Sequence, residues 1–203
     1  MSNSTSEAAV NHNLLKIGNR VLKIGGRVLT RALPDPQDEE VVIGSQTWKK
    51  YNLAFDDGEP GISHAVVNYG QGDVVEYYYT WYAAVRVASK IEGWHLPSAS
   101  EWATLVNYAG GQLHAGTKLK STYGWSSYLG NGTDDYGFQG LPAGHSNYEG
   151  TVLELKLKAL FWTSNEYSHS YNTATYYELS DSVAHTSYTK QNQYYSVRLV
   201  KDV

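Results

Sequence analysis

The side chains best suited to chemistry or recognition are concentrated near the C-terminus, in residues 161–200. Between Thr163 and Ser196, 24 of the 34 residues are Tyr, Ser, Thr, Asn or His. Tyr offers a large, rigid contact area at low entropic cost, and Ser and Asn offer adaptable hydrogen bonds. Leu179 and Val183 are the only aliphatic side chains there larger than Ala, so we do not expect this segment to pack a core. The composition favours a contact surface for another macromolecule; a solvated sheet edge rich in the same residues is the alternative.

We expect this contact surface to be formed by side chains that project from loops and short strands of the segment. Aromatic rings would act as anchors, and the smaller polar side chains would act as adjustable contacts. The candidate ligand-binding residues are Tyr167, His169, Tyr171, Asn172, Tyr176, Glu178, Ser180, Asp181, His185, Thr186, Ser187, Tyr188, Gln191 and Asn192.

Enzymatic and metal chemistry have little support in the spacing of the reactive residues. The chain has no Cys, which excludes disulfides, thiol catalysis and Cys-ligated metals. The histidines beyond residue 60 lack the His-x-x-x-His or His-x-His spacing typical of metal sites. We interpret His95 as a core histidine bonded to the backbone, and Asp134 and Asp135 as a turn rather than a carboxylate pair. We therefore expect a protein that is not an enzyme, with no catalytic residue, metal or cofactor.

Charge and composition limit the class of partner. The net charge is -4 and only 18% of the residues are charged, whereas nucleic-acid-binding domains usually carry a basic surface. We therefore do not expect a nucleic-acid partner. Hydrophobic residues make up 41% of the chain and aromatic residues 13%, so the core must rely on aromatic rings. We expect the six Trp residues to be framework: Trp48, Trp81, Trp94, Trp102, Trp125 and Trp162.

The ends and the hydropathy of the chain bear on its location. Residues 1–7 (MSNSTSE) have neither the basic nor the apolar region of a secretory signal. No apolar run approaches the length that spans a membrane, and the absence of Cys removes a bacterial lipid-anchor site. We expect no membrane insertion and a location on the surface of a virion or other extracellular particle, with the cytoplasm until release as the alternative.

The elements that position the candidate surface follow an N-terminal repeat. The sequence KIGNRVL at residues 16–22 is followed at once by KIGGRVL at residues 23–29, and the Gly-Asn and Gly-Gly steps predict tight turns in a small β-ribbon. Such a ribbon is marginal alone, so it is a candidate element for homo-oligomerisation or attachment. The predicted organisation is a flexible N-terminus over residues 1–13, the β-repeat over 14–33, a linker over 34–40 and a ligand-binding domain over 41–203.

The ligand-binding domain is predicted to contain two helices. Residues 41–48 predict a strand pair, and a helix over residues 80–90 is expected to have Thr80 as its N-cap. A capping box of Ser98 and Glu101 begins the second helix, which Gly110-Gly111 ends. Short, irregular antiparallel strands and glycine-rich turns should follow, which gives an α+β domain. The expected apolar faces are Trp81, Ala84, Val85 and Ala88 in the first helix, and Trp102, Leu105, Val106 and Ala109 in the second.

A series of motifs occurs in one order through this domain. They are residues 43–48 (IGSQTW), 79–84 (YTWYAA), 93–98 (GWHLPS), 115–120 (AGTKLK), 141–144 (LPAG), 161–164 (FWTS) and 196–202 (SVRLVKD). Together they resemble the Fibrobacter succinogenes major paralogous domain, a branch of the C-type-lectin-like fold, over residues 41–202. The resemblance implies an α+β, C-type-lectin-like domain.

Relatives in this family include the variable proteins of diversity-generating retroelements, found in phages and gut bacteria. Residues 161–200 resemble their diversified segment in position and composition. The resemblance implies a phage-encoded or mobile-element receptor-binding or host-attachment protein, whose partner is a protein or glycan receptor on a host or bacterial cell surface. A calcium-independent carbohydrate-binding domain or a bacterial adhesin, each with a fixed ligand, is the alternative.

Overall fold

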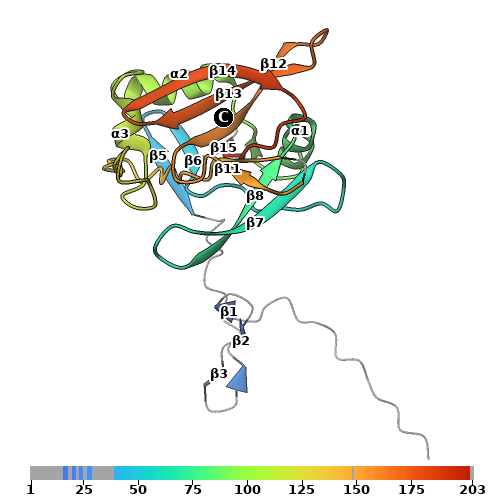
Figure 1. Cartoon of the computed structure of the whole chain (residues 1–203), viewed down its shortest axis with the longest axis vertical. Coiled ribbons are helices and arrows are strands. Elements are labelled where there is room, and N and C mark those ends of the chain that lie inside the picture. The colour runs from blue at the N-terminus through green and yellow to red at the C-terminus, as the bar shows by residue number, and fades with distance from the viewer. Residues whose placement is uncertain are drawn as a thin grey trace, which may run out of the picture. The chain divides into compact units, whose positions relative to one another are not determined.

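The computed structural model describes residues 16–17, 20–21, 23–24, 27–28, 39–147 and 149–201 (Figure 1). The chain divides into two compact units, Met1–Pro36 and Gln37–Val203. The flexible N-terminus predicted for residues 1–13 lies outside the described residues, as does most of the predicted linker. No helix in the described ranges is long and apolar enough to cross a membrane.

Each copy of the N-terminal repeat contains one antiparallel pair of two-residue strands. β1 (Lys16–Ile17) pairs with β2 (Arg20–Val21), and β3 (Lys23–Ile24) pairs with β4 (Arg27–Val28). Two residues separate the strands of each pair, the spacing of a tight turn. The strands therefore lie where the repeat predicts them, but the residues described in this region form two separate pairs instead of one ribbon.

The second unit is built mainly from β-strands, so the predicted α+β, C-type-lectin-like fold class is wrong. Strands hold 38% of the described residues and helices 14%, in several small sheets and three helices. The prediction expected only short, irregular strands after the second helix. Instead, the Tyr- and Thr-rich segment forms strands of eight to ten residues, because aromatic and β-branched side chains favour a half-buried pleated surface.

The strand pair predicted over residues 41–48 is confirmed and joins the end of the chain. β5 (Glu40–Ile43) begins one residue inside the predicted linker and pairs with β6 (Gln46–Lys49). Gly44 turns the chain between them with a φ of 61°, a conformation that glycine adopts without strain. The pair joins β15 (Val200–Lys201) and β9 (Trp94–His95) in a four-stranded sheet of order β5-β6-β15-β9.

Three further sheets complete the second unit. β7 (Ile62–Asn68) and β8 (Asp73–Tyr79) form a hairpin, and β10 (His145–Ser146) pairs with β11 (Val152–Leu153). The candidate surface lies on the third sheet, of β12 (Ala159–Ser168), β13 (Thr173–Ser180) and β14 (Val183–Lys190). The register between β13 and β14 is continuous, whereas β12 shifts register between Trp162 and Ser168.

Helix α1 (Trp81–Ala88) begins at the predicted N-cap, Thr80, whose hydroxyl accepts from the N–H of Ala83. Its apolar face is rotated from the predicted one. Val85, which was expected to be buried, is 39% exposed and Trp81 is half-buried, because small side chains occupy the interior side of the helix. The buried residues are Ala83, Ala84, Val87 and Ala88.

Helix α2 (Ala99–Tyr108) has the predicted capping box. The N–H of Glu101 donates to Ser98 Oγ, and the N–H of Ser98 donates to the Glu101 carboxylate at 2.7 Å. The sequence does not predict α3 (Ala115–Leu119), because five residues that include a glycine are too short to show a helical apolar period. The predicted apolar face of α2 is confirmed as buried: Trp102, Leu105, Val106 and Ala109.

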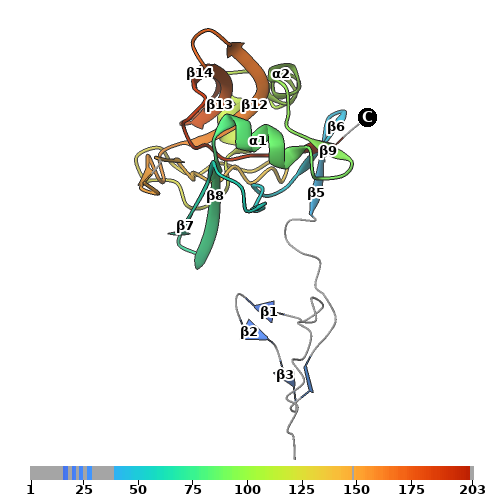
Figure 2. The same cartoon turned by 90° about the vertical axis from the view of Figure 1, so that its right-hand side faces the viewer.

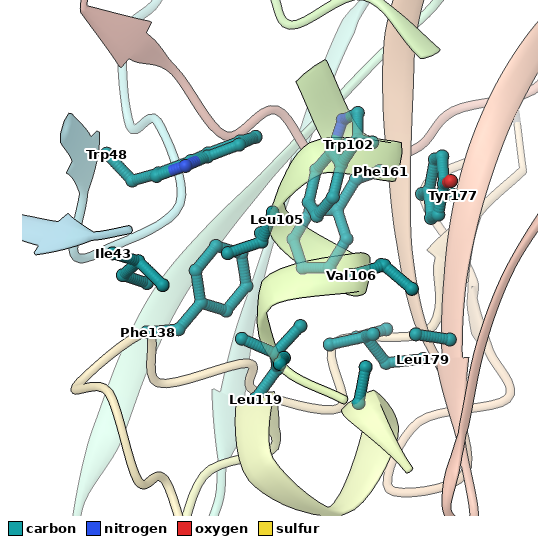
Figure 3. Packing of buried hydrophobic residues seen from close by; sticks show 14 of the residues in the cluster. Ile43, Trp48, Trp102, Leu105, Val106, Leu119, Phe138, Phe161, Tyr177 and Leu179 are labelled. Carbon is teal, nitrogen blue, oxygen red and sulfur yellow. The ribbon is translucent and has the colours of Figure 1, made fainter. Parts of the chain in front are cut away.

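Aromatic rings form the centre of one hydrophobic cluster (Figure 3). Trp102 of α2 lies 4.9 Å from Trp48 and 5.2 Å from Tyr177, as distances between ring centroids. Tyr177 and Leu179 extend this cluster from β13. The expectation that residues 163–196 pack no core is therefore wrong, because buried side chains of β13 belong to hydrophobic clusters.

A second cluster packs beside the root of the C-terminal sheet. Trp162 stacks on Tyr195 with ring centroids 4.6 Å apart, and its indole N–H donates to the carbonyl of Tyr79 at 2.6 Å. Helix α1 packs against β8 and β12 at this cluster (Figure 2). The prediction that the Trp residues are framework is confirmed for the five that are buried: Trp48, Trp94, Trp102, Trp125 and Trp162.

Arg198, in the C-terminal motif, is completely buried and joins distant segments of the chain. Its guanidinium donates to the carbonyls of Lys50 at 2.7 Å and Phe138 at 2.6 Å, and to Asn52 Oδ1 at 2.9 Å. The amide of Asn52 donates in turn to the buried carboxyl group of Glu76 at 3.1 Å. Burial lowers the pKa of Arg198 to about 9, which leaves it charged at neutral pH, and burial raises the pKa of Glu76.

A cluster of ion pairs fixes the loop before β7 to α1. The Asp57 carboxylate accepts from Arg86 Nε at 2.8 Å, and Lys90 Nζ lies 2.7 Å away. Hydrogen bonds from Arg86 and then Lys90 hold the pKa of Asp57 well below its ordinary value of 3.8. The loop is therefore held by a carboxylate that remains ionised in mild acid.

Replacing Arg198 tests its structural role. We expect Arg198→Met to lower the free energy of unfolding by about 3–5 kcal/mol, because it leaves the carbonyls of Lys50 and Phe138 and the Oδ1 of Asn52 without a donor and removes the positive charge near the buried Glu76. Lys201→Met is the control, since Lys201 pairs with Glu40 at the surface and should cost about 0–1 kcal/mol. Chemical denaturation measures both, and equally small effects would contradict the role given to Arg198.

The lowered pKa of Asp57 predicts an acid-sensitive contribution to stability. Because the folded pKa lies below the unfolded value, this contribution is present at neutral pH and is lost as the pH falls towards the folded pKa. Asp57→Asn should destabilise the protein at neutral pH and flatten the dependence of Tm on pH below about 4. Asp135→Asn, at an exposed carboxylate, is the control. Parallel Tm curves for wild type and Asp57→Asn would rule this contribution out.

Candidate ligand-binding surface

The sheet of β12, β13 and β14 is buried at one end and exposed at the other. Near the β13–β14 turn, Tyr177 and Leu179 face one hydrophobic cluster and Tyr176 packs against the other, so this end has core on both faces. Towards the β12–β13 turn, the side chains of Tyr167 and Tyr171 are 57% and 70% exposed. The candidate surface begins where the two clusters end.

Most of the predicted contact residues reach solvent, but the structure does not bring all of them together. Asp181 lies at the β13–β14 turn, whereas Tyr171 and Asn172 lie at the β12–β13 turn, at the other end of the sheet. The exposed residues are Tyr167, His169, Tyr171, Asn172, Asp181, Thr186, Tyr188 and Asn192; the half-buried ones are Tyr176, Ser180, His185 and Ser187; Glu178 and Gln191 are buried.

Glu178 and Gln191 are buried, so the prediction that their side chains project from the surface is wrong. The backbone N–H of Gln191 donates to the carbonyl of Asn172, and its side-chain amide donates to Glu166 Oε1, both at 2.9 Å. Lys158 Nζ lies 3.7 Å from the Glu178 carboxylate. These polar side chains hold strands and loops behind the surface. Strand register decides their burial, and composition does not reveal it.

Tyr167 of β12 and Tyr188 of β14 form a stacked pair on the exposed end of the sheet. Their ring centroids are 3.9 Å apart and their planes differ by 2°. Both rings remain more than half exposed. Because stacking already orders both side chains, a ligand that contacts them loses less conformational freedom in the protein on binding.

The β13–β14 turn is held by contacts beneath it. Lys120 Nζ donates to the carbonyl of Asp181 at 2.8 Å and lies 4.3 Å from the centroid of the Trp125 ring. Burial lowers the pKa of Lys120. Gly116 of α3 approaches the turn so closely that an added Cβ would lie 2.4 Å from the backbone carbon of Ser182. This end of the sheet is therefore fixed against α3 and supports the exposed end.

An open hollow of about 560 Å³ lies beside the β12–β13 turn. It combines amide side chains, one cation and the ring of Tyr82, which is 55% exposed. The sequence prediction missed three of its lining residues. One of them, Tyr82, could have been identified as a surface residue, because it lies outside the apolar face expected for α1. The lining residues are Asn172, Gln191 and Asn192, which were predicted, and Thr80, Tyr82 and Lys190, which were not.

Other titratable side chains hold loops and helix ends. His95 Nε2 lies 2.7 Å from the Glu101 carboxylate, and the His95 side chain is 37% exposed, so it is not the enclosed core histidine predicted. Asp134 has a φ of 50° and accepts from the N–H of Gln139, which confirms the predicted turn. Among the described residues, no group of three or more His, Cys, Asp or Glu side chains is placed to hold a metal ion.

Fold and surface together define a mostly β domain in which an aromatic core supports an exposed, Tyr-rich sheet end. The profile of a family described as the Fibrobacter succinogenes major domain matches residues 41–201, so the chain belongs to this family. The family resemblance carried by the ordered motifs is thereby confirmed. No curated protein and no solved structure matches the chain significantly.

Two tyrosines of the same segment should respond oppositely to replacement. Tyr171 is 70% exposed and Tyr177 is 5% exposed. We expect Tyr171→Ser to change the free energy of unfolding by no more than about 0.5 kcal/mol. Tyr177→Ser should cost about 3–5 kcal/mol, because it removes a ring from the core. Chemical denaturation measures both; similar costs would show that the segment is not divided into surface and core.

Proposed function

We propose that this protein is a non-enzymatic binding protein, encoded by a phage or mobile element, that attaches to a receptor through a diversified C-terminal surface. In this proposal a diversity-generating retroelement varies the side chains of the surface. The proposal is carried by one observation: the Tyr-, Asn- and His-rich positions around the β12–β13 turn are exposed on a sheet whose other end is anchored in two aromatic clusters. Membership of the family supports it.

In the proposed mechanism, the exposed Tyr rings are anchors and the smaller side chains adjust to each ligand. Tyr167 and Tyr188 supply a pre-ordered stacked pair, and Tyr171 adds a ring at the turn. His169 and Asn172 are exposed near the same turn and offer hydrogen-bonding groups. Because the frame already holds the strands, binding does not have to order the backbone, which lowers its entropic cost.

The proposed partner is a protein or glycan receptor on a host or bacterial cell surface, and the proposed location is the surface of a virion or other extracellular particle. Several copies on one particle would raise a weak single-site affinity through avidity. The N-terminal repeat, with its two strand pairs, is the proposed element for self-association or attachment.

Genome comparison tests this proposal directly. We expect a near-copy of the DNA for residues 161–200 elsewhere in the source genome, differing at adenines and close to a reverse-transcriptase gene. Sibling sequences should differ mainly at exposed positions such as Tyr171 and Asn172, and should keep buried ones such as Trp162 and Tyr177. Equal variation across residues 41–144 would contradict diversification of the C-terminal surface.

A calcium-independent carbohydrate-binding domain with a fixed ligand is the second candidate. The hollow of about 560 Å³ favours it, because amide groups of Asn172 and Asn192, the cation of Lys190 and the ring of Tyr82 surround a space suited to a small polar ligand. A glycan array tests this candidate. One reproducible sugar signal that is lost in Tyr82→Ala would support it, and a blank array would leave the diversified protein surface as the better account.

A further inference from the structure

β14 is an edge strand that lacks the usual protection. Among the described strands it pairs only with β13, and it lies on the outer side of the sheet in Figure 1. Edge strands present unpaired N–H and C=O groups, which proteins commonly shield with charges, prolines or bulges. β14 has eight residues in continuous register, no proline, and one charged side chain, Lys190, at its end.

The hydrogen bonds at the two ends of β14 show which backbone groups point away from the sheet. The N–H of Ala184 donates to the carbonyl of Gln112, outside the sheet, at 2.9 Å. Because backbone direction alternates along an antiparallel pair, the N–H and C=O groups of Thr186 and Tyr188 point the same way. The carbonyl of Lys190 accepts from the N–H of Gln193 and closes the far end. Within the described part of the chain, no hydrogen bond reaches the outward groups of Thr186 and Tyr188.

A small hollow lies between this free edge and α2. Its volume is about 140 Å³, and its walls include Ala103 and Val106 of α2 and Ala184 and Thr186 of β14. Side chains two residues apart share one face of a strand, so Tyr188, stacked on Tyr167, continues the same face beyond Thr186. The free backbone groups, the hollow and the aromatic pair therefore follow one another along the strand.

We infer that the free edge of β14 at Thr186 and Tyr188 binds an extended segment of a partner protein by strand addition. Main-chain groups of the segment pair with the outward N–H and C=O groups of these two residues. One small side chain enters the 140 Å³ hollow, and the side chain two positions along, about 6.6–6.8 Å away, contacts the stacked tyrosines. This inference rests on the proposed function and names its partner as a protein. It also gives the surface a source of affinity that persists when side chains change, because main-chain hydrogen bonds do not depend on them.

A second copy of β14 fits this edge less well than a partner segment. In an antiparallel pair of two such edges that leaves the bond between Ala184 and Gln112 intact, Thr186 of one copy lies opposite Tyr188 or Lys190 of the other. The hollow beside Thr186 then faces either a ring that is already stacked on Tyr167 or a long cationic side chain, instead of a small one. An extended segment of another protein can place a small side chain there.

The test uses a displayed library of random linear peptides selected on the full-length protein. Thr186→Pro removes the outward N–H and is compatible with an edge strand, whereas Thr186→Val keeps that N–H. Both variants lose the bond from the Thr186 hydroxyl to the carbonyl of Tyr176, so they form a matched pair. We expect enriched peptides to bind wild type and Thr186→Val alike, and to bind Thr186→Pro at least about tenfold more weakly.

A second matched pair tests the hollow without changing the strand. Ala103→Leu fills the hollow from α2, and Thr104→Leu adds the same side chain at the neighbouring exposed position. The enriched peptides should lose affinity for Ala103→Leu only. If circular dichroism shows that Thr186→Pro is unfolded, this pair decides the question.

Three results would overturn the inference. The first is that the protein enriches no peptides over a support without protein. The second is that peptides bind equally to both members of the deciding pair. The third is that the wild type is a dimer that Thr186→Pro dissociates, because a second copy would then occupy the edge. The proposed function fails separately. If replacing Tyr167 and Tyr171 with Ser abolishes receptor binding while Thr186→Pro preserves it, the proposed side-chain surface is supported and strand addition is not. If Thr186→Pro abolishes binding while the Tyr replacements preserve it, strand addition at β14 is supported and the side-chain surface is not.

Discussion

The hydrogen bonds of the buried Arg198 guanidinium are the constraint on which the rest of the structure depends. A cation enclosed by protein requires partners for its N–H groups, and here carbonyls of Lys50 and Phe138 and the amide of Asn52 supply them. These bonds tie the chain that follows the Tyr-rich segment to the first hairpin of the domain. Trp162 fixes the chain at the start of the segment through its bond to Tyr79. With both ends held, we expect the strands between them to tolerate variation at exposed positions.

The same residue type serves two purposes in this segment. Tyr177 and Tyr195 are buried against tryptophan rings, while Tyr167, Tyr171 and Tyr188 are open to solvent. Whether a tyrosine is buried or exposed depends on the face of the strand that carries it and on its distance from the hydrophobic clusters. The segment is buried on both faces near α2 and exposed towards the β12–β13 turn. An amphipathic ring suits both environments, so a surface rich in tyrosine can continue into the core without a change of composition.

Local signals in the sequence were sufficient for some features and not for others. The capping box at Ser98 and Glu101 predicted α2, and the strand pair around Gly44 was equally evident, because each depends on a few adjacent residues. Helix α3 and the fold class were not predictable in this way, since they depend on packing between distant segments. For the site, the exposed rings were identified from composition. The burial of Glu178 and Gln191 and the contribution of Tyr82 required the register and the placement of α1.

The central claim is that one frame supports many different side chains at the exposed end of the sheet. The most direct measurement is the thermal stability of a library in which the exposed positions vary together among Tyr, Ser, Asn, Thr, Asp and His, and buried positions of the segment vary in a second library. The account predicts that most members of the first library melt within a few degrees of the parent and that most of the second unfold. Widespread unfolding in the first library would contradict it. The first library varies Tyr167, His169, Tyr171, Asn172, Tyr188 and Asn192, and the second varies Ala174, Tyr177, Leu179 and Ala184.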